Sequence, residues 1–282
     1  FKNDIETRDK IIKRYFKNLP LINQASKKGE LETVRYLVSL GVQPNYVTLN
    51  NASLNGNLEL VKFIKSLGLR PDYNALYNAS ESGNLELVKF LIRSGIDPDK
   101  KILDLGSESG NLELMRYLIS LGIKPDQNTL NGASYSGNLE LVRYLISLGI
   151  KPNKETLIFG SGNLELVVYL ISLGMKPDQY SLNKASQNGN LELVMYLISL
   201  GIKPDDDTLN NASKSGNLEL VMYLISLAII PYQQSLNNAS RSENLELVRY
   251  LIGSGIIPDY NTLYIANKSG NLDVVKYLVN LD

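Results

Sequence analysis

Carboxylates are almost the only side chains in this sequence that could carry out acid–base or metal chemistry, because the chain has no histidine and no cysteine. Disulfides, zinc sites of the Cys/His type, thiol nucleophiles and imidazole catalysis are therefore excluded. The densest carboxylate cluster is Asp205-Asp206-Asp207. Asp205 stands at a predicted helix cap, and no ligand loop surrounds the other two carboxylates. We therefore expect no metal, no cofactor and no catalytic residue.

An aromatic residue recurs at one fixed position, and such a row could stack the bases of a single-stranded nucleic acid. The chain has 29 basic and 29 acidic residues, whereas a nucleic-acid binder needs a net basic face. The row falls on the buried face of a predicted helix, which favours packing in the core. We expect no nucleic-acid partner and assign to the core the residues Tyr36, Phe63, Phe90, Tyr117, Tyr144, Tyr169, Tyr196, Tyr223, Tyr250 and Tyr277.

The sequence has no apolar run near the roughly 20 residues that a transmembrane helix needs. Residues 1–17 form a predicted amphipathic helix, with Ile5, Ile11 and Phe16 opposite basic side chains. Such a helix can lie on a membrane, but at the end of a repeat array it more often covers the first repeat. We predict a capping helix and no membrane partner. The chain starts at Phe1 without a methionine, so we expect a processed or trimmed product.

A repeated segment predicts the helices that carry these residues. The segment typically reads Gly-Asn-Leu-Glu-Leu-Val and occurs ten times with small changes. Its copies start every 27 residues, except for one interval of 25 between Gly137 and Gly162. A fixed period in this range indicates a solenoid, in which each short unit buries its apolar face against its neighbours. The predicted repeats are residues 18–44, 45–71, 72–98, 99–125, 126–152, 153–177, 178–204, 205–231, 232–258 and 259–282.

Each repeat contains two predicted short helices, and residues 126–152 serve as the example. Asp126 can cap a first helix over Gln127–Ser134, because its carboxylate accepts hydrogen bonds from free amides. Gly137 ends that helix in the left-handed conformation, and Asn138 caps a second helix over Leu139–Leu148. Apolar residues cover most of the second helix, so we expect burial on more than one side. The predicted fold class is an all-α solenoid of helix-turn-helix repeats.

The sequence from Thr129 to Gly149 reads T-L-x-x-A-S-x-x-G-N-L-E-L-V-R-Y-L-I-x-x-G and resembles the ankyrin repeat. The resemblance extends from about Pro20 to Asp282. Ankyrin repeats have 33 residues, and the residues missing here fall between Asp126 and Thr129, where that family builds a β-hairpin finger. We therefore expect reduced or absent fingers. The resemblance implies recognition of another protein, without catalysis or a cofactor.

Two further features set these repeats apart. An asparagine replaces the family's histidine, and we expect it to satisfy backbone groups in the adjacent turn, with ligand binding as the alternative. These residues are Asn50, Asn131, Asn183, Asn210 and Asn237. The short units and the bias toward Asn, Ile and Lys resemble the ankyrin-like arrays of giant viruses of amoebae.

The solvent-facing stripe of the second helix changes character in three consecutive repeats. Most copies carry a basic residue there, three positions after a glutamate, and this spacing permits a weak ion pair. The sixth, seventh and eighth copies instead carry Val168, Met195 and Met222, which we call the apolar strip. Aligned apolar side chains on an outer face often mark a contact, although drift between duplicated copies explains them equally well.

The repeat is irregular at three places. Two residues are missing between Leu157 and Gly162, so the first helix of the sixth repeat should end about half a turn early. We expect this deletion to change the stacking angle between the fifth and sixth repeats. Ala228 and Glu243 replace cap glycines. Each is expected to cost a few tenths to about 1 kcal/mol through the left-handed conformation.

Function is expected where the copies differ, because the repeated residues already explain capping and burial. One variable row on the first helices changes from acidic, at Glu81 and Glu108, to basic, at Lys214 and Arg241. A polar partner lying along the array would experience that gradient, whereas a solvated face is the plain alternative. The candidate partner-binding residues are Tyr46, Tyr73, Lys100, Tyr135, Tyr180, Asp206, Lys214, Arg241 and Tyr260, together with the apolar strip of Val168, Met195 and Met222.

Two functions of different classes remain. The first is a non-catalytic adaptor or scaffold that binds another protein through its first helices. The second is an architectural component of a larger assembly, a viral one included, that binds further copies of itself or neighbouring components through the apolar strip. An enzyme is the weakest interpretation, because the inventory of acid–base groups and nucleophiles is poor and each glutamate is explained by its repeat.

Overall fold

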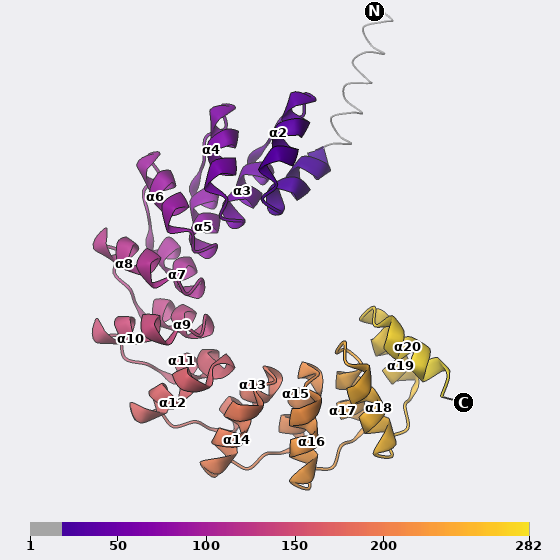
Figure 1. The fold of residues 1–282 in the computed structure, drawn as a ribbon. Coiled ribbons are helices and arrows are strands. Elements are labelled where there is room, and N and C mark those ends of the chain that lie inside the picture. Colours follow the sequence, from indigo (N-terminus) through magenta and orange to yellow (C-terminus); the bar gives the residue numbers. More distant parts are fainter. Residues whose placement is uncertain (1–18, 282) are drawn as a thin grey trace, which may run out of the picture. The chain divides into compact units, whose positions relative to one another are not determined.

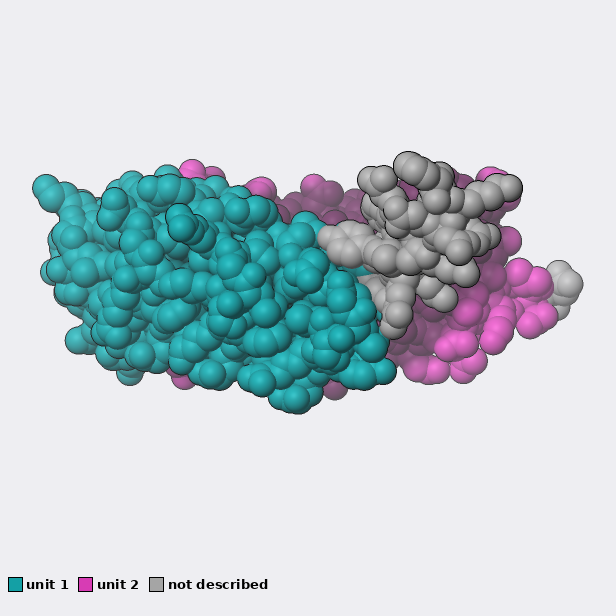
Figure 2. Space-filling model, turned by 90° about the horizontal axis from the view of Figure 1, so that it is seen from above, with its two compact units in different colours: residues 1–151 teal, residues 152–282 magenta. Residues whose placement is uncertain are grey.

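The computed structural model describes residues 19–281, which form helices joined by short turns, without a strand among them (Figure 1). The predicted capping helix of residues 1–17 lies outside the described residues. By its internal contacts the chain divides into two compact units, residues 1–151 and 152–282 (Figure 2). Each unit is a stack of helix pairs that follows the sequence repeat. The predicted all-α solenoid of ankyrin-like helix pairs is therefore confirmed.

In the first unit, helical residues 19–27 precede α2, and each later repeat contributes a first and a second helix. The first helices are α3 (Tyr46–Leu54), α5 (Tyr73–Glu81), α7 (Lys100–Glu108) and α9 (Gln127–Tyr135). The second helices are α2 (Leu31–Ser39), α4 (Leu58–Ser66), α6 (Leu85–Arg93), α8 (Leu112–Ser120) and α10 (Leu139–Ser147). First helices of neighbouring repeats pack against one another, so the stack grows by one helix pair at a time.

The second unit continues the same pattern. Its first helices are α11 (Lys154–Phe159), α13 (Gln179–Gln187), α15 (Asp206–Ser215), α17 (Gln233–Ala239) and α19 (Tyr260–Lys268). Its second helices are α12 (Leu164–Ser172), α14 (Leu191–Ser199), α16 (Leu218–Ser226), α18 (Leu245–Gly253) and α20 (Leu272–Val279). As in the first unit, each first helix packs on the first helix of the next repeat.

The sixth repeat has the shortened first helix that its missing residues predict. Helix α11 has only six residues and continues as a single 3₁₀ turn, η1 (Gly160–Gly162). The boundary between the two compact units, between Lys151 and Pro152, falls at the junction of the fifth and sixth repeats. The expected change in stacking angle at this junction stays a prediction.

The same apolar positions fill the core in each helix pair. Leu130 of α9 and the α10 residues Leu141, Val142 and Leu145 are fully buried. Leu148, directly after α10, is exposed. Within α10, Leu139, Tyr144 and Ile146 are half-buried, and only Glu140, Arg143 and Ser147 are exposed. The expectation that the second helix is buried on more than one side is therefore confirmed for α10, although Leu148 after the helix reaches solvent.

Polar caps begin the helices as the sequence predicts. The Asp126 carboxylate accepts a hydrogen bond from the Thr129 amide, and the Thr129 hydroxyl accepts one from the Asp126 amide. The Asn138 side chain accepts a hydrogen bond from the Leu141 amide at 2.9 Å. Ala228, which replaces a cap glycine, has a φ of +67°. The predicted backbone strain at Ala228 is therefore confirmed.

Glu243 does not adopt the left-handed backbone conformation that Ala228 adopts. The first helix α17 already ends at Ala239, and the Ser242 amide donates to the Ala239 carbonyl oxygen. Ala228 is the one residue other than glycine with a positive φ in the described part of the chain. The turn before Glu243 therefore has a different backbone conformation from the glycine turns of the other repeats. The predicted free-energy cost of a left-handed glutamate is wrong.

The capping asparagine of the second helix also joins neighbouring repeats. The Nδ2 amide of Asn138 donates to the carbonyl oxygen of Gly110 in the preceding repeat at 2.8 Å. One side chain thereby satisfies a helix amide of its own repeat and a turn carbonyl of its neighbour. We call this arrangement the asparagine clamp. It recurs at Asn57–Gly29, Asn84–Gly56, Asn111–Gly83, Asn190–Gly162, Asn217–Gly189 and Asn244–Gly216.

The asparagine row of the first helices was expected to satisfy backbone groups in the adjacent turn, and this expectation is wrong. In three of these residues the Oδ1 atom instead accepts a hydrogen bond from a hydroxyl at the start of the next first helix. The pairs are Asn183–Thr208 at 2.8 Å, Asn210–Ser235 at 3.0 Å and Asn237–Thr262 at 2.8 Å. Asn50 is the exception, because Ala75 occupies the hydroxyl position and Asn50 Oδ1 is buried without a hydrogen bond.

Candidate functional site

The variable positions of the first helices lie at the ends of those helices. Tyr46, Tyr73, Lys100, Asp206 and Tyr260 are the first residues of their helices. Tyr180 is the second residue of α13, Tyr135 and Lys214 lie in the last turns of α9 and α15, and Arg241 follows α17.

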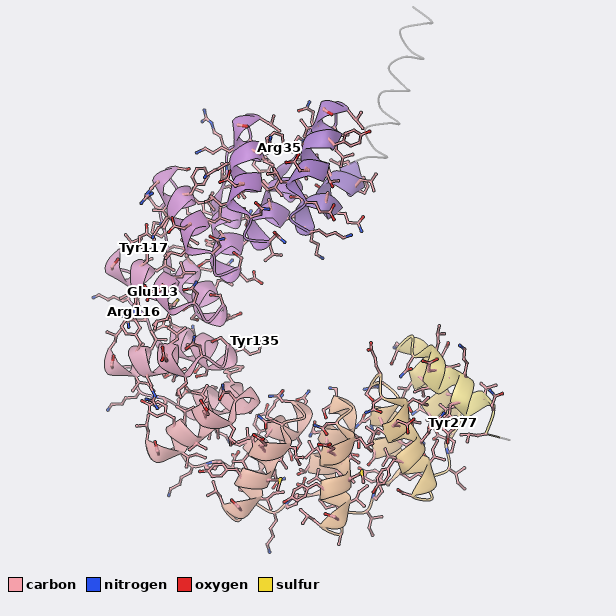
Figure 3. All side chains as sticks on the ribbon, viewed as in Figure 1. Arg35, Glu113, Arg116, Tyr117, Tyr135 and Tyr277 are labelled. Carbon is pink, nitrogen blue, oxygen red and sulfur yellow. The ribbon has the colours of Figure 1, made fainter. Side chains whose placement is uncertain are left out.

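Several of these side chains contribute nothing to the core. Tyr135 is 68% exposed and Tyr260 is 82% exposed. Figure 3 shows Tyr135 on the first-helix side of its unit, whereas Arg116 and Tyr117 lie on the second-helix side. The two sides of a helix pair therefore present different residues to solvent, and the variable tyrosines belong to the first-helix side.

Lys100 differs from the other candidates, because its ammonium group is held within the first unit. Its Nζ atom forms ion pairs with Asp104 and, at 3.0 Å, with Asp126. It also donates to the Thr129 hydroxyl at 3.2 Å. Burial opposes the ionisation of Asp126, but hydrogen bonds from Lys100 and from the Thr129 amide outweigh it and hold the pKa of Asp126 below its ordinary value. These partners therefore hold the positively charged ammonium group of Lys100 in one place.

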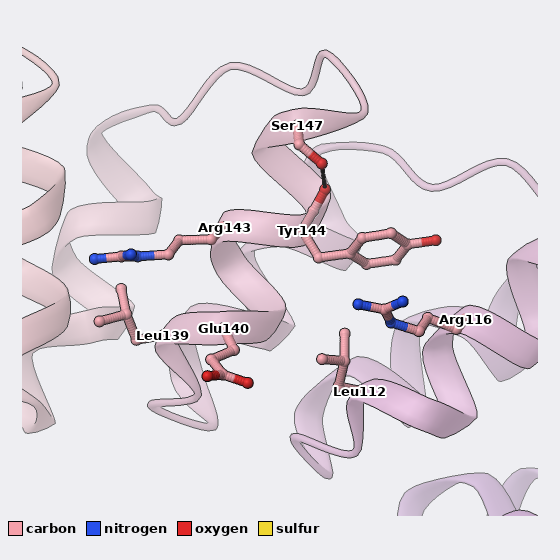
Figure 4. A pocket seen from close by; sticks show the side chains of 7 residues that line it. All are labelled: Leu112, Arg116, Leu139, Glu140, Arg143, Tyr144 and Ser147. Carbon is pink, nitrogen blue, oxygen red and sulfur yellow. Dashed lines mark hydrogen bonds between the residues drawn. The ribbon is translucent and has the colours of Figure 1, made fainter.

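Basic side chains of the second helices lie over aromatic rings of the following repeat. The Arg116 guanidinium is 4.9 Å from the centroid of the Tyr144 ring (Figure 4). This ring is half-buried, so the predicted core role of the aromatic row needs correction. Its rings are half-buried or exposed, and several of them carry cations, an arrangement worth about 0.5–1 kcal/mol at exposed sites. Equivalent pairs are Arg35–Phe63, Lys89–Tyr117 and Arg249–Tyr277.

A shallow groove of about 530 Å³ lies on this outer side between α8 and α10. It is lined by Leu112, Arg116, Leu139, Glu140, Arg143, Tyr144 and Ser147 (Figure 4). Arg116 is already placed on the Tyr144 ring, and the Ser147 hydroxyl donates to the Tyr144 carbonyl oxygen within its own helix. The groove therefore consists of residues that stack the repeats, and we assign no ligand to it.

The apolar strip occupies the cation position of this outer layer in the sixth to eighth repeats. Val168 is 38% exposed, Met195 is 46% exposed and Met222 is 45% exposed. By the register of the repeat, the aromatic rings that follow these residues are Tyr196, Tyr223 and Tyr250. No cation of residues 19–281 is placed over those three rings, while the glutamates Glu165, Glu192 and Glu219 of the same helices remain exposed.

A pocket that sequence reasoning missed lies between α17 and α19 in the second unit. Its volume is about 470 Å³, and it is lined by Gln234, Asn237, Arg241, Asn261, Tyr264, Ile265, Lys268 and Ser269. Only Arg241 was chosen as a candidate from the sequence. The spacing of the lining residues does contain a signal in the sequence. Positions 234, 237 and 241 share one helix face, and positions 261, 264 and 268 share another. A row contains the same position of successive repeats, so it does not reveal that these two helix faces meet.

The carboxylates of Asp205-Asp206-Asp207 do not form a metal centre. Asp205 accepts a hydrogen bond from the Thr208 amide at 2.9 Å, as its predicted cap position requires. Within residues 19–281, no group of three His, Cys, Asp or Glu side chains is arranged to hold a metal ion. In the same residues, every helix is too short or too polar to cross a membrane.

Comparison with known proteins agrees with the helix pairs and their sequence. A family model described as ankyrin repeats (3 copies) matches residues 21–102 and 49–129. No curated protein matches the chain. Ankyrin repeats are generally protein–protein interaction modules, and the family is typically non-catalytic. The chain therefore carries ankyrin repeats in residues 21–129, and its later repeats follow the same sequence pattern and helix arrangement.

Proposed function

We propose that this chain is a non-catalytic adaptor or scaffold that binds another protein through the variable positions of its first helices. The observation that supports this proposal is that repeated and variable positions have different roles. Repeated residues cap, clamp and fill the core, whereas variable residues such as Tyr135 and Tyr260 are largely exposed. Exposed aromatic side chains offer large contact area, and tyrosine is enriched among residues that dominate binding energy.

The proposed contact residues are described for each unit separately. The first unit contributes Tyr46, Tyr73, Lys100 and Tyr135. The second unit contributes Tyr180, Asp206, Lys214, Arg241 and Tyr260. Repeat-to-repeat variation of these side chains supplies specificity, because the backbone positions them at nearly identical places in each helix pair.

The test starts with affinity purification from the native source and identification of the captured partner by mass. With the purified partner, Tyr135→Ala and Tyr260→Ala are each expected to weaken binding about tenfold, because each removes a large exposed contact. Tyr36→Ala is the matched control, since Tyr36 is an exposed tyrosine on a second helix. Unchanged affinity in both test variants contradicts the proposal.

A second candidate function is architectural, and the apolar strip is the observation that favours it. Three exposed apolar residues in consecutive repeats could bring copies of the chain together. In this case the molecular mass measured by sedimentation velocity rises with concentration, and Met195→Lys with Met222→Lys restores the monomer.

The control for the architectural function changes charge equally at another exposed place. Ile230→Lys with Ile257→Lys replaces two highly exposed residues outside the strip and should leave association unchanged. A wild-type chain that stays monomeric at every concentration contradicts self-association through the strip.

A further inference from the structure

The pocket between α17 and α19 offers hydrogen-bond donors and positive charge without a carboxylate. Arg241 and Lys268 line it from neighbouring repeats, and both are exposed. Neither forms an ion pair with a residue in the described part of the chain. Asn261 and Gln234 add side-chain amides, and the Gln234 Nε2 atom also donates to Asn238 at 3.0 Å. Two unpaired cations on either side of one cavity favour a negatively charged occupant.

Asn237 adds a hydrogen-bond donor to the lining of the pocket. Its side chain is only 5% exposed, and its Oδ1 atom accepts hydrogen bonds from Gln233 at 3.3 Å and Thr262 at 2.8 Å. The Nδ2 amide of Asn237 has no acceptor within residues 19–281, although the residue lines the pocket. Asn237 Nδ2 is not a fully buried unpaired atom, so it is open to the pocket, where water or an acceptor of a bound partner can take its hydrogen bond.

The pocket belongs to a longer basic row. Lys214, Arg241 and Lys268 occupy the same position in three consecutive repeats, and all three are exposed. Their helices α15, α17 and α19 pack in order, and packed helices lie about 8–10 Å apart. A polyproline II segment is extended, rises about 3.1 Å per residue and returns to the same face every third residue, so its side chains three residues apart match this spacing. A single phosphate group is too small to contact the basic side chains of all three repeats.

We infer that the second unit binds an extended acidic segment of a partner protein, with one carboxylate in the pocket between α17 and α19. Arg241 and Lys268 neutralise that carboxylate, and Asn237 donates a hydrogen bond to it. Further carboxylates, placed at every third residue of the segment, lie along the row toward Lys214. The inference rests on the proposed function and adds the chemistry of the partner.

The test measures binding of a fluorescent peptide, Glu-Gly-Ser repeated four times, to the full chain by anisotropy. Arg241→Gln with Lys268→Gln is expected to weaken binding at least about tenfold, and added salt should weaken wild-type binding. Replacing each glutamate of the peptide by glutamine should abolish binding. Arg249→Gln with Lys276→Gln is the matched control, because it removes two charges from the same two repeats on the second-helix side, where Arg249 lies over Tyr277 and Lys276 lies in α20.

A second variant tests the hydrogen-bond donor itself. Asn237→Asp keeps the oxygen that accepts from Gln233 and Thr262, but replaces the Nδ2 donor by a negatively charged acceptor. Aspartate occurs at the corresponding position of the fourth repeat, where Asp104 accepts the Thr129 hydroxyl at 2.7 Å and is paired with Lys100, whereas Gln233 is the corresponding donor to position 237. We expect Asn237→Asp to keep the melting temperature within a few degrees and to lose peptide binding about tenfold or more.

The outcomes separate this inference from the proposed function. Equal binding of the glutamate and glutamine peptides, or unchanged binding in Arg241→Gln with Lys268→Gln, overturns the acidic-segment assignment. Tighter binding, by about tenfold or more, of a peptide with phosphoserine in place of glutamate assigns the pocket to phosphate and also overturns it. If the captured partner still depends on Tyr135 and Tyr260 in either case, the proposed function stands without this inference.

Discussion

Asn50 and Asn183 occupy the same place in two repeats, yet their surroundings differ by one hydroxyl group. Asn183 accepts a hydrogen bond from Thr208 of the next repeat. Asn50 has Ala75 at the corresponding position, and its Oδ1 atom is buried without a donor. An unpaired buried acceptor costs about 1–3 kcal/mol. A single substitution in a neighbouring repeat thus decides whether the asparagine is satisfied.

Ala75→Thr is expected to stabilise the first unit by about 0.5–1.5 kcal/mol, because the new hydroxyl supplies the missing donor to Asn50. Threonine fits this position elsewhere, since Thr208 is fully buried there. The measurement is the free energy of unfolding in urea. Ala75→Val is the control, because valine has the same shape and no hydroxyl. Equal stabilisation by valine would show that packing, and no hydrogen bond, is responsible.

At the scale of the element, most second helices depend on one asparagine that serves two repeats, whereas α2 begins after Glu30 without a side-chain cap. Asn217 caps α16 by accepting a hydrogen bond from the Leu220 amide at 3.0 Å. Its Nδ2 amide donates to the Gly189 carbonyl oxygen at 2.8 Å. Aspartate caps a helix as well as asparagine does but cannot donate this second bond. The clamp therefore explains why the cap of the second helix is asparagine in these repeats, whereas the first helices often use aspartate.

Asn217→Asp is expected to destabilise the chain by about 1 kcal/mol, because it keeps the cap and loses the clamp to Gly189. Asp205→Asn, the reverse exchange at the cap of α15 in the same repeat, is the control. It should change the free energy of unfolding by less than about 0.5 kcal/mol, since asparagine caps equally well. If both exchanges change the free energy of unfolding by the same amount, loss of the clamp is not the cause of the destabilisation.

On the scale of the whole molecule, sensitivity to acid is distributed along the chain through helix caps. A hydrogen bond from the Lys154 ammonium, at 2.6 Å, holds the pKa of Asp178 below its ordinary value despite partial burial. The Thr262 amide, at 2.8 Å, lowers the pKa of Asp259. Asp126, beside Lys100, shows the same direction. These carboxylates belong to three different repeats, so protonation weakens several places together.

A lowered pKa in the folded state means that the contribution to stability is present above the unfolded pKa, which is about 3.9 for aspartate. That contribution is lost as the pH falls through the folded pKa. We expect the melting temperature to decline below about pH 4. Asp126→Asn with Asp178→Asn and Asp259→Asn should flatten the decline while keeping the caps, because Asn45 and Asn153 cap equivalent helices. An unchanged acid profile in this triple variant argues against the caps as its source.

The sequence by itself determined the features that depend on residues near one another in the chain. The period identified the helix pairs, and residue types identified the Asp126 and Asn138 caps, the buried leucines and the strain at Ala228. These features are local, because a cap, a turn and an amphipathic face each involve only a few consecutive residues.

Only the tertiary structure decided which side chains of neighbouring repeats meet. It placed Tyr144 under Arg116, paired Asn237 with Thr262 and formed the pocket around Arg241. It also showed that the turn before Glu243 avoids the left-handed conformation. A period aligns equivalent positions but says nothing of the rotation between stacked helix pairs. That rotation determines which rows come into contact, and therefore which polar groups are satisfied and which remain open to a partner.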